Sequence, residues 1–185
     1  MSTLRRLQEV HPGPVCVVET GTLRSDGPNA VDGDGWSTMA WGWYCSQVGG
    51  RVYTVDIEPI NMNVCRRITE PYSPWIEYVV SDSVTFLGGW PSGSARLVDL
   101  VYLDSMDYED RGASEAHCLA EAQAVLPHLA PVALILIDDT PYDQDQRHGC
   151  VEGQSGKGIL AIPFLRGHGF RVEFAIENQT LLARA

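Results

Sequence analysis

Two adjacent carboxylates follow a run of aliphatic residues that has the composition of a buried strand. The run is Leu134–Ile137 (LILI), and Asp138 and Asp139 come directly after it. Like charges on neighbouring residues repel each other, and burial raises the cost of ionisation unless a cation or a hydrogen-bond donor compensates. The sequence therefore predicts a positive charge beside this pair.

Acidic residues also follow the other predicted strands. Any one of them could simply cap a helix or a turn. Five strands that all end in this way are harder to explain by capping, because edge and central strands share no need for it. Ligands of open parallel sheets bind beyond the carboxyl ends of the strands, so we expect these acids to converge on one site. They are Glu19, Asp56, Asp82, Asp104, Asp138 and Asp139.

The residues after the second and third strands suit an adenosine ligand. Asp56 ends its strand where a carboxylate can accept hydrogen bonds from both ribose hydroxyls. Asp82, together with Ser81 or Ser83, lies where it can bind the adenine amino group. We therefore expect a nucleoside to bind between these two strand ends.

The first strand is followed by residues that suit an amino acid head group. Gly21 and Thr22 allow the backbone to approach a ligand closely, and the helix that opens near Ser37 offers backbone N–H donors to a carboxylate. No GxGxxG follows this strand, which disfavours a pyrophosphate. Lys157, in GKGILAIPFL, lacks the spacing of a phosphate loop, so we interpret its glycines as a helix entry.

The elements that position these residues alternate between short apolar strands and helices, which is typical of a parallel sheet with helices on both faces. The tail FRVEFAIENQTLLARA has no room for a crossover helix and predicts an antiparallel hairpin that turns at Glu177 and Asn178. The expected parallel strands are Val15–Glu19, Arg51–Asp56, Ile76–Val80, Leu97–Asp104 and Val132–Asp138. The expected helices are Leu4–Val10, Trp36–Val48, Ile60–Thr69, Ser83–Gly88, Ser114–Leu129 and Lys157–His168.

Length and composition predict one domain over residues 1–185, with an N-terminal helix in 1–13 and mobile active-site loops at 22–35 and 141–156. A net charge of −11 disfavours nucleic acid and anionic membranes as partners. The five cysteines show no CxxC spacing, and no signal core or membrane-spanning run is present, which favours a reduced, cytoplasmic protein.

Five short motifs together resemble those of class I S-adenosylmethionine-dependent methyltransferases. They are ETGT with DGWST, VDIEP, SDS, YLDS and LIDDT, in that order along residues 15–184. The chain looks most like the metal-dependent sugar O-methyltransferase group that includes macrocin O-methyltransferase, with cephalosporin hydroxylase-like proteins as relatives. This resemblance implies a single-domain, Rossmann-like α/β fold with a mostly parallel seven-stranded sheet.

The same resemblance assigns roles to individual residues. It implies that Glu19 and Gly21 belong to the first cofactor motif, that Asp56 binds the ribose and that Asp82 binds the adenine. It also implies that the acids after the fourth and fifth strands hold a divalent ion, for which Mg²⁺ suits an all-carboxylate set. In the alternative interpretation Asp139 caps the following turn and only Asp138 faces the cleft. The implied metal ligands are Asp104, Asp138 and Asp139.

The chain departs from these relatives where they carry a histidine that looks like the general base. In LDSMDYED the nearest residue is Asp107, which could be a base, an extra metal ligand or neither. His148, in DQRHGC, is a second candidate base. We interpret the other histidines as structural: His11, His117, His128 and His168.

The predicted function is S-adenosylmethionine-dependent and divalent-metal-dependent methylation of a hydroxyl on a small molecule, such as a sugar or a natural-product precursor. The alternatives are a hydroxylase-like relative that does not methylate, or an inactive protein that binds S-adenosylmethionine or S-adenosylhomocysteine. The aromatic helix WSTMAWGWYCS favours either core packing or a homo-oligomer contact. We expect a small-molecule acceptor and a homo-oligomer.

Overall fold

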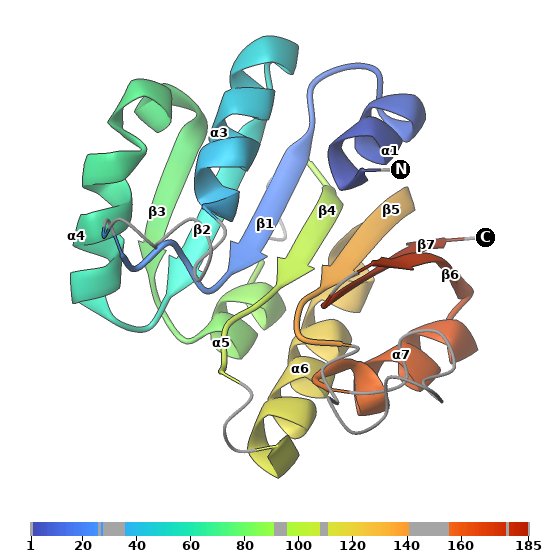
Figure 1. Cartoon of the computed structure of the whole chain (residues 1–185). Coiled ribbons are helices and arrows are strands. Elements are labelled where there is room, and N and C mark those ends of the chain that lie inside the picture. Colours follow the sequence, from blue (N-terminus) through green and yellow to red (C-terminus); the bar gives the residue numbers. More distant parts are fainter. Residues whose placement is uncertain are drawn as a thin grey trace.

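The computed structural model describes residues 2–25, 27, 36–90, 96–107, 111–140, 156–176 and 178–184. They form one seven-stranded sheet in the order β3-β2-β1-β4-β5-β7-β6 (Figure 1). The first five strands of the chain are parallel, and β7 pairs antiparallel with both β5 and β6. The strand order reverses between β1 and β4, which is where sheets of this kind bind ligands.

The element bounds follow the predicted alternation. The strands are β1 Cys16–Thr20, β2 Arg51–Asp56, β3 Ile76–Val80, β4 Val98–Leu103, β5 Leu129–Ile137, β6 Phe170–Ile176 and β7 Gln179–Arg184. The helices are α1 Thr3–Val10, α3 Ser37–Val48, α4 Pro59–Ile68, α5 Ser83–Gly88, α6 Arg111–Val125 and α7 Gly158–Gly167, with 3₁₀ turns η1 Glu70–Trp75 and η2 Leu126–His128. The predicted fold class, including the C-terminal hairpin, is confirmed.

Apolar side chains of β4 alternate between the two faces of the sheet, as a strand buried on both sides requires. Leu100 and Tyr102 pack in the cluster that includes α1 and α3. Val101 and Leu103 pack in the opposite cluster, with α5, α6 and α7. Two apolar layers therefore hold β1 and β4 rigidly at the centre, which fixes the positions of their carboxyl ends.

The two predicted boundaries on either side of Pro127 are wrong by several residues. The helix expected to run to Leu129 ends as α6 at Val125 and continues only as a 3₁₀ turn, while β5 begins at Leu129 rather than Val132. Pro127 explains the difference, because proline lacks the N–H donor that an α-helix needs and disfavours helical backbone at the residue before it. The fifth strand is consequently longer at its amino end.

The cysteines and the tryptophans of α3 differ in how deeply they are buried. Cys16, Cys45, Cys65 and Cys118 are free and buried, as predicted, whereas Cys150 lies outside the described residues. On α3, Trp41 is buried but Trp43 is 47% exposed, so a homo-oligomer contact through this helix stays a prediction. Within the described ranges we find no helix with both the length and the apolar character to span a bilayer.

Candidate cofactor and acceptor site

Two adjoining cavities open at the carboxyl ends of the strands, beside the reversal in strand order. Their volumes are about 320 and 360 Å³, and Gly21, Asp56, Ile57 and Ser105 line both. The first cavity extends towards β3 and α6, and the second extends towards the acids that follow β4 and β5. The strand-end residues expected to form one site therefore do converge, with Glu19 as the exception.

Gly21 lies at the junction of β1, β2 and β4. Its backbone N–H donates to the carbonyl of Val55 over 2.8 Å, and its φ of +80° lies in the left-handed region that favours glycine. A Cβ at this position would overlap the backbone carbonyl of Asp104. The glycine is therefore required for the close approach of three strand ends around the cavities.

Gly21→Ala is expected to disturb both cavities, because the added methyl group would force the ends of β1 and β4 apart. We expect a melting temperature lower by roughly 5 °C or more, on the basis of about 1–3 kcal/mol for a strained residue. Differential scanning calorimetry measures this, with Gly13→Ala as the control because a Cβ at Gly13 meets no atom within 4 Å. Equal melting temperatures for the two variants would contradict the argument.

Glu19 lies beneath the cavities and does not line them. Its side chain is buried, and its Oε2 accepts hydrogen bonds from Thr38 (2.5 Å) and Thr54 (2.9 Å). Burial raises the pKa of Glu19, and a hydrogen bond from Ser37 opposes that shift. Two predicted cofactor residues, Glu19 and Ser37, thus tie α3 to the sheet. Thr22, whose hydroxyl oxygen lies 2.8 Å from that of Thr54, lines the second cavity.

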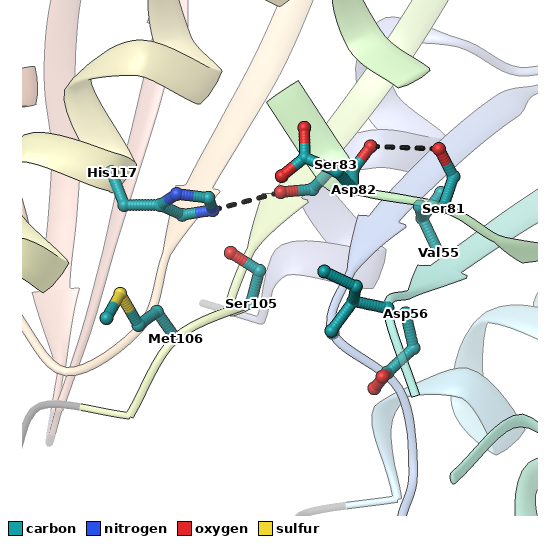
Figure 2. A pocket seen from close by; sticks show the side chains of 10 residues that line it. Val55, Asp56, Ser81, Asp82, Ser83, Ser105, Met106 and His117 are labelled. Atoms are coloured by element: carbon teal, nitrogen blue, oxygen red, sulfur yellow. Dashed lines mark hydrogen bonds between the residues drawn. The ribbon is translucent and has the colours of Figure 1, made fainter. Parts of the chain in front are cut away.

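The first cavity contains the predicted adenosine residues. Figure 2 shows Asp56 on one wall and Ser81, Asp82 and Ser83 along another. Asp56 Oδ1 accepts a hydrogen bond from the backbone N–H of Glu58 (2.7 Å), which orients the carboxylate at the boundary of the two cavities. Asp82 Oδ1 accepts the N–H of Thr85 (2.7 Å) and so caps α5, and the hydrogen bonds of Thr85 lower the pKa of Asp82.

His117 was interpreted as structural, but it lines this cavity (Figure 2). Its Nε2 lies 3.0 Å from Ser83 Oγ and 3.6 Å from Glu121 Oε1. The nearby carboxylate of Glu121 raises the pKa of His117. His117 and Glu121 are spaced i, i+4 on one face of α6, a signal that sequence reasoning could have used.

Two apolar residues of the same cavity were also missed. Ile57 follows Asp56 directly, and Met106 comes two residues after Asp104. Ile57 is 64% exposed, so its side chain is accessible from the cavity. Their position next to strand-end acids could have identified them in the sequence, because a flat heterocycle needs apolar walls as well as hydrogen bonds.

The second cavity brings together Asp104, Asp138 and Asp139, as predicted. One carboxylate oxygen from each lies within 4.8 Å of the others. The expected positive charge is present in the structure, and it is Lys157. Its Nζ lies 3.0 Å from Asp104 Oδ1 and 3.0 Å from Asp139 Oδ2, and only 3% of its side chain is exposed.

The charges of this acidic cluster are only partly balanced. Burial alone would lower the pKa of Lys157, but Asp104 and Asp139 raise it above its ordinary value, so the ammonium stays charged. Burial, and then the negative charge of Asp138, raise the pKa of Asp104. Asp138 Oδ1 is buried and has no hydrogen-bond partner among the described residues. One ammonium against three carboxylates, with a buried acceptor left over, fits a hard, oxygen-ligated divalent cation.

Asp107 lies at the rim of the second cavity and pairs with Arg24. The two guanidinium N–H groups donate to its two carboxylate oxygens over 2.8 and 2.9 Å, which links the loop after β1 to the loop after β4. Hydrogen bonds from Arg24 lower the pKa of Asp107. A carboxylate stabilised as an anion is a weak general base. The other candidate base, His148, lies outside the described residues.

Comparisons with known proteins agree with this geometry. A family model described as a methyltransferase domain matches residues 33–140, more than half of the chain. A search of the curated proteins found no match. Many solved structures share the fold, and three of them illustrate the low sequence identity and the high coverage of both chains.

The first of these is cofactor-bound Rv0187 from MTB, with a TM-score of 0.65, 19% identity and coverage of 99% of this chain and 80% of that one. The second is the O-methyltransferase TomG from Streptomyces achromogenes in complex with SAM, with a TM-score of 0.62, 14% identity and coverage of 98% and 77%. The third is the N-methyltransferase NodS from Bradyrhizobium japonicum, with a TM-score of 0.55, 13% identity and coverage of 98% and 92%. Because these neighbours include O- and N-methyltransferases, the fold alone leaves the acceptor atom open.

Proposed function

Because this chain belongs to the methyltransferase-domain family, we propose that it transfers the methyl group of S-adenosylmethionine to a hydroxyl of a small molecule, with a divalent ion at the acidic cluster. The observation that carries this proposal is the pair of adjoining cavities that share Asp56. One has the lining expected for adenosine, and the other contains three carboxylates. A nucleoside and an ion-bound acceptor would then meet at the residues common to both.

The cofactor would lie across the junction between the cavities. Asp56 would accept hydrogen bonds from the ribose hydroxyls, while Asp82 and Ser83 would bind the adenine edge and Ile57 and Met106 would cover its faces. Gly21 and Thr22 would contact the methionine end, on the side of the second cavity. The aliphatic and thioether side chains keep water away from the adenine, and the acids orient the polar ends of the cofactor.

The acceptor would lie in the second cavity. Asp104, Asp138 and Asp139 would hold the ion, which when bound lowers the pKa of a coordinated hydroxyl and orients it. The Arg24–Asp107 pair forms part of the rim and limits the size of the acceptor. Since Arg24 holds Asp107 as an anion, we assign Asp107 to positioning, and His148 remains the proposed base. An exposed Trp43 on α3 supports a homo-oligomer contact.

One observation favours a second candidate, a protein that binds the cofactor without transferring its methyl group. The resemblance to the sugar O-methyltransferases places a histidine base where this chain has Asp107, and Asp107 is engaged by Arg24. A site with the cofactor pocket but without a base would bind S-adenosylmethionine and leave it intact. The two candidates predict the same binding and different chemistry.

Calorimetric titration with S-adenosylhomocysteine, with and without Mg²⁺, tests binding, and transfer of a labelled methyl group tests chemistry. We expect binding in the micromolar range and label transfer to a hydroxyl acceptor that depends on Mg²⁺. The acceptor library should contain sugars, phenols and amines. Binding without transfer to any acceptor would favour the second candidate, and transfer to amines alone would refute the hydroxyl assignment. Absence of binding would refute both.

A further inference from the structure

We propose that Lys157 is the internal counter-ion of the acidic cluster, a positioning residue that holds Asp104 and Asp139 from the protein side while their cavity side stays open to a cation. The open cavity side rests on the proposed function. The counter-ion role depends on the contacts of Lys157 alone and can be tested without any ligand. Lys157 does not line the second cavity, although the three acids do.

The ammonium group of Lys157 contacts the acids from the protein interior, not from the cavity. Its Nζ lies 3.0 Å from one oxygen of Asp104 and 3.0 Å from one oxygen of Asp139. The side chain of Lys157 is 3% exposed, whereas those of Asp104 and Asp139 are 32% and 22% exposed. Lys157 instead lines a small separate cavity together with Cys118 and Glu121 of α6. The acids therefore face solvent in the cavity, and the lysine faces the interior.

Gly156 and Gly158 allow the backbone of Lys157 to lie close to the end of β5. Gly156 has a φ of +65°, and a Cβ on it would overlap the backbone carbonyl of Asp139. The backbone N–H of Lys157 donates to that same carbonyl over 3.2 Å. At Gly158 a Cβ would lie 2.6 Å from Ile162 Cδ1 and 2.9 Å from a methyl of Thr140. The Gly-Lys-Gly sequence thus packs the start of α7 directly against the end of β5, so that backbone and side chain of Lys157 both hold Asp139.

The contact between Lys157 and the acids reduces the electrostatic repulsion within the acidic cluster. Three carboxylates within 4.8 Å repel one another, and the buried ammonium compensates one of them permanently. The cluster can then keep its geometry before any ion binds, and two acidic side chains remain for a divalent ion to balance. Removal of the lysine alone would leave three acids uncompensated, whereas removal of the lysine together with Asp139 leaves two and so reduces their repulsion.

The test uses Lys157→Met, Asp139→Asn and the double variant in metal-free buffer, with melting temperature as the readout. We expect Lys157→Met to melt about 10 °C below the parent, on the basis of typical losses from broken buried pairs. The double variant should recover at least half of that loss, because two acidic side chains then repel each other in the cluster instead of three, although Asp104 still lacks its ammonium. Arg166→Met, which removes an exposed cation from the same helix, is the control and should melt within about 2 °C of the parent.

A second measurement adds Mn²⁺ to the parent and to Lys157→Met. The ion should raise the melting temperature of Lys157→Met more than that of the parent, because it then compensates a cluster with one more unbalanced charge. Equal melting temperatures for Lys157→Met and Arg166→Met would overturn the inference. The inference would also be overturned if the melting temperature of the double variant fell by as much as the two single variants together, or if the double variant failed to fold. If the parent binds neither S-adenosylhomocysteine nor Mn²⁺, the proposed function fails, yet the metal-free comparison still decides the role of Lys157.

Discussion

Asp56→Ala is expected to weaken the binding of S-adenosylhomocysteine by at least about 100-fold. Asp56 is the strand-end carboxylate common to both cavities, and the backbone N–H of Glu58 fixes its orientation. Hydrogen bonds to a charged group contribute about 1.5–3 kcal/mol each, so losing two bonds to the ribose hydroxyls corresponds to two or more powers of ten. Isothermal titration calorimetry of the parent and the variant measures the change.

Glu77→Gln is the matched control for this experiment. Glu77 is a carboxylate on β3, the strand next to that of Asp56, but its side chain is 58% exposed and pairs with Arg51 at 3.6 Å. We expect its affinity for S-adenosylhomocysteine to stay within about twofold of the parent, since exposed pairs contribute little. Circular dichroism should show that both variants are folded. Parent-like affinity in Asp56→Ala would refute the placement of the nucleoside.

Asp138→Asn combined with Asp139→Asn is expected to remove the response to Mg²⁺ and to leave the cofactor pocket intact. Both residues line the second cavity and neither lines the first. The substitutions keep the side-chain volumes while removing two of the three charges that would hold the ion. Methyl transfer in the presence of Mg²⁺ should fall by at least about 100-fold, because metal catalysis contributes several kcal/mol. The affinity for S-adenosylhomocysteine should change by less than about threefold.

Titration of the double variant with Mn²⁺ separates loss of the ion from loss of the fold. The parent should release or absorb heat on binding the ion, and the double variant should not. Glu77→Gln again serves as the control, since it removes a carboxylate that lies outside both cavities. If the double variant bound Mn²⁺ as tightly as the parent does, or transferred methyl groups at the parent's rate, the acidic cluster would not be the metal site.

Some features of this protein are determined by the sequence alone. Strand alternation, the acid after each strand and the tail without a crossover helix are local properties, because the side-chain period of a strand and the length of a connection act within a few residues. Once parallel strands are assigned, their carboxyl ends must share one edge of the sheet. The sequence alone therefore places five acids at one edge of the sheet: Asp56, Asp82, Asp104, Asp138 and Asp139.

Only the tertiary structure decided which side chains complete the site. Lys157 reaches the acids because α7 docks against the end of β5, and Arg24 reaches Asp107 because two loops distant in the chain lie side by side. Conversely, Glu19 ends its strand like the other acids, but Thr38 and Thr54 bind it beneath the cavities. The sequence contains the charges of this protein, but helix docking and burial determine which of them meet, since such contacts depend on long-range packing that no local pattern specifies.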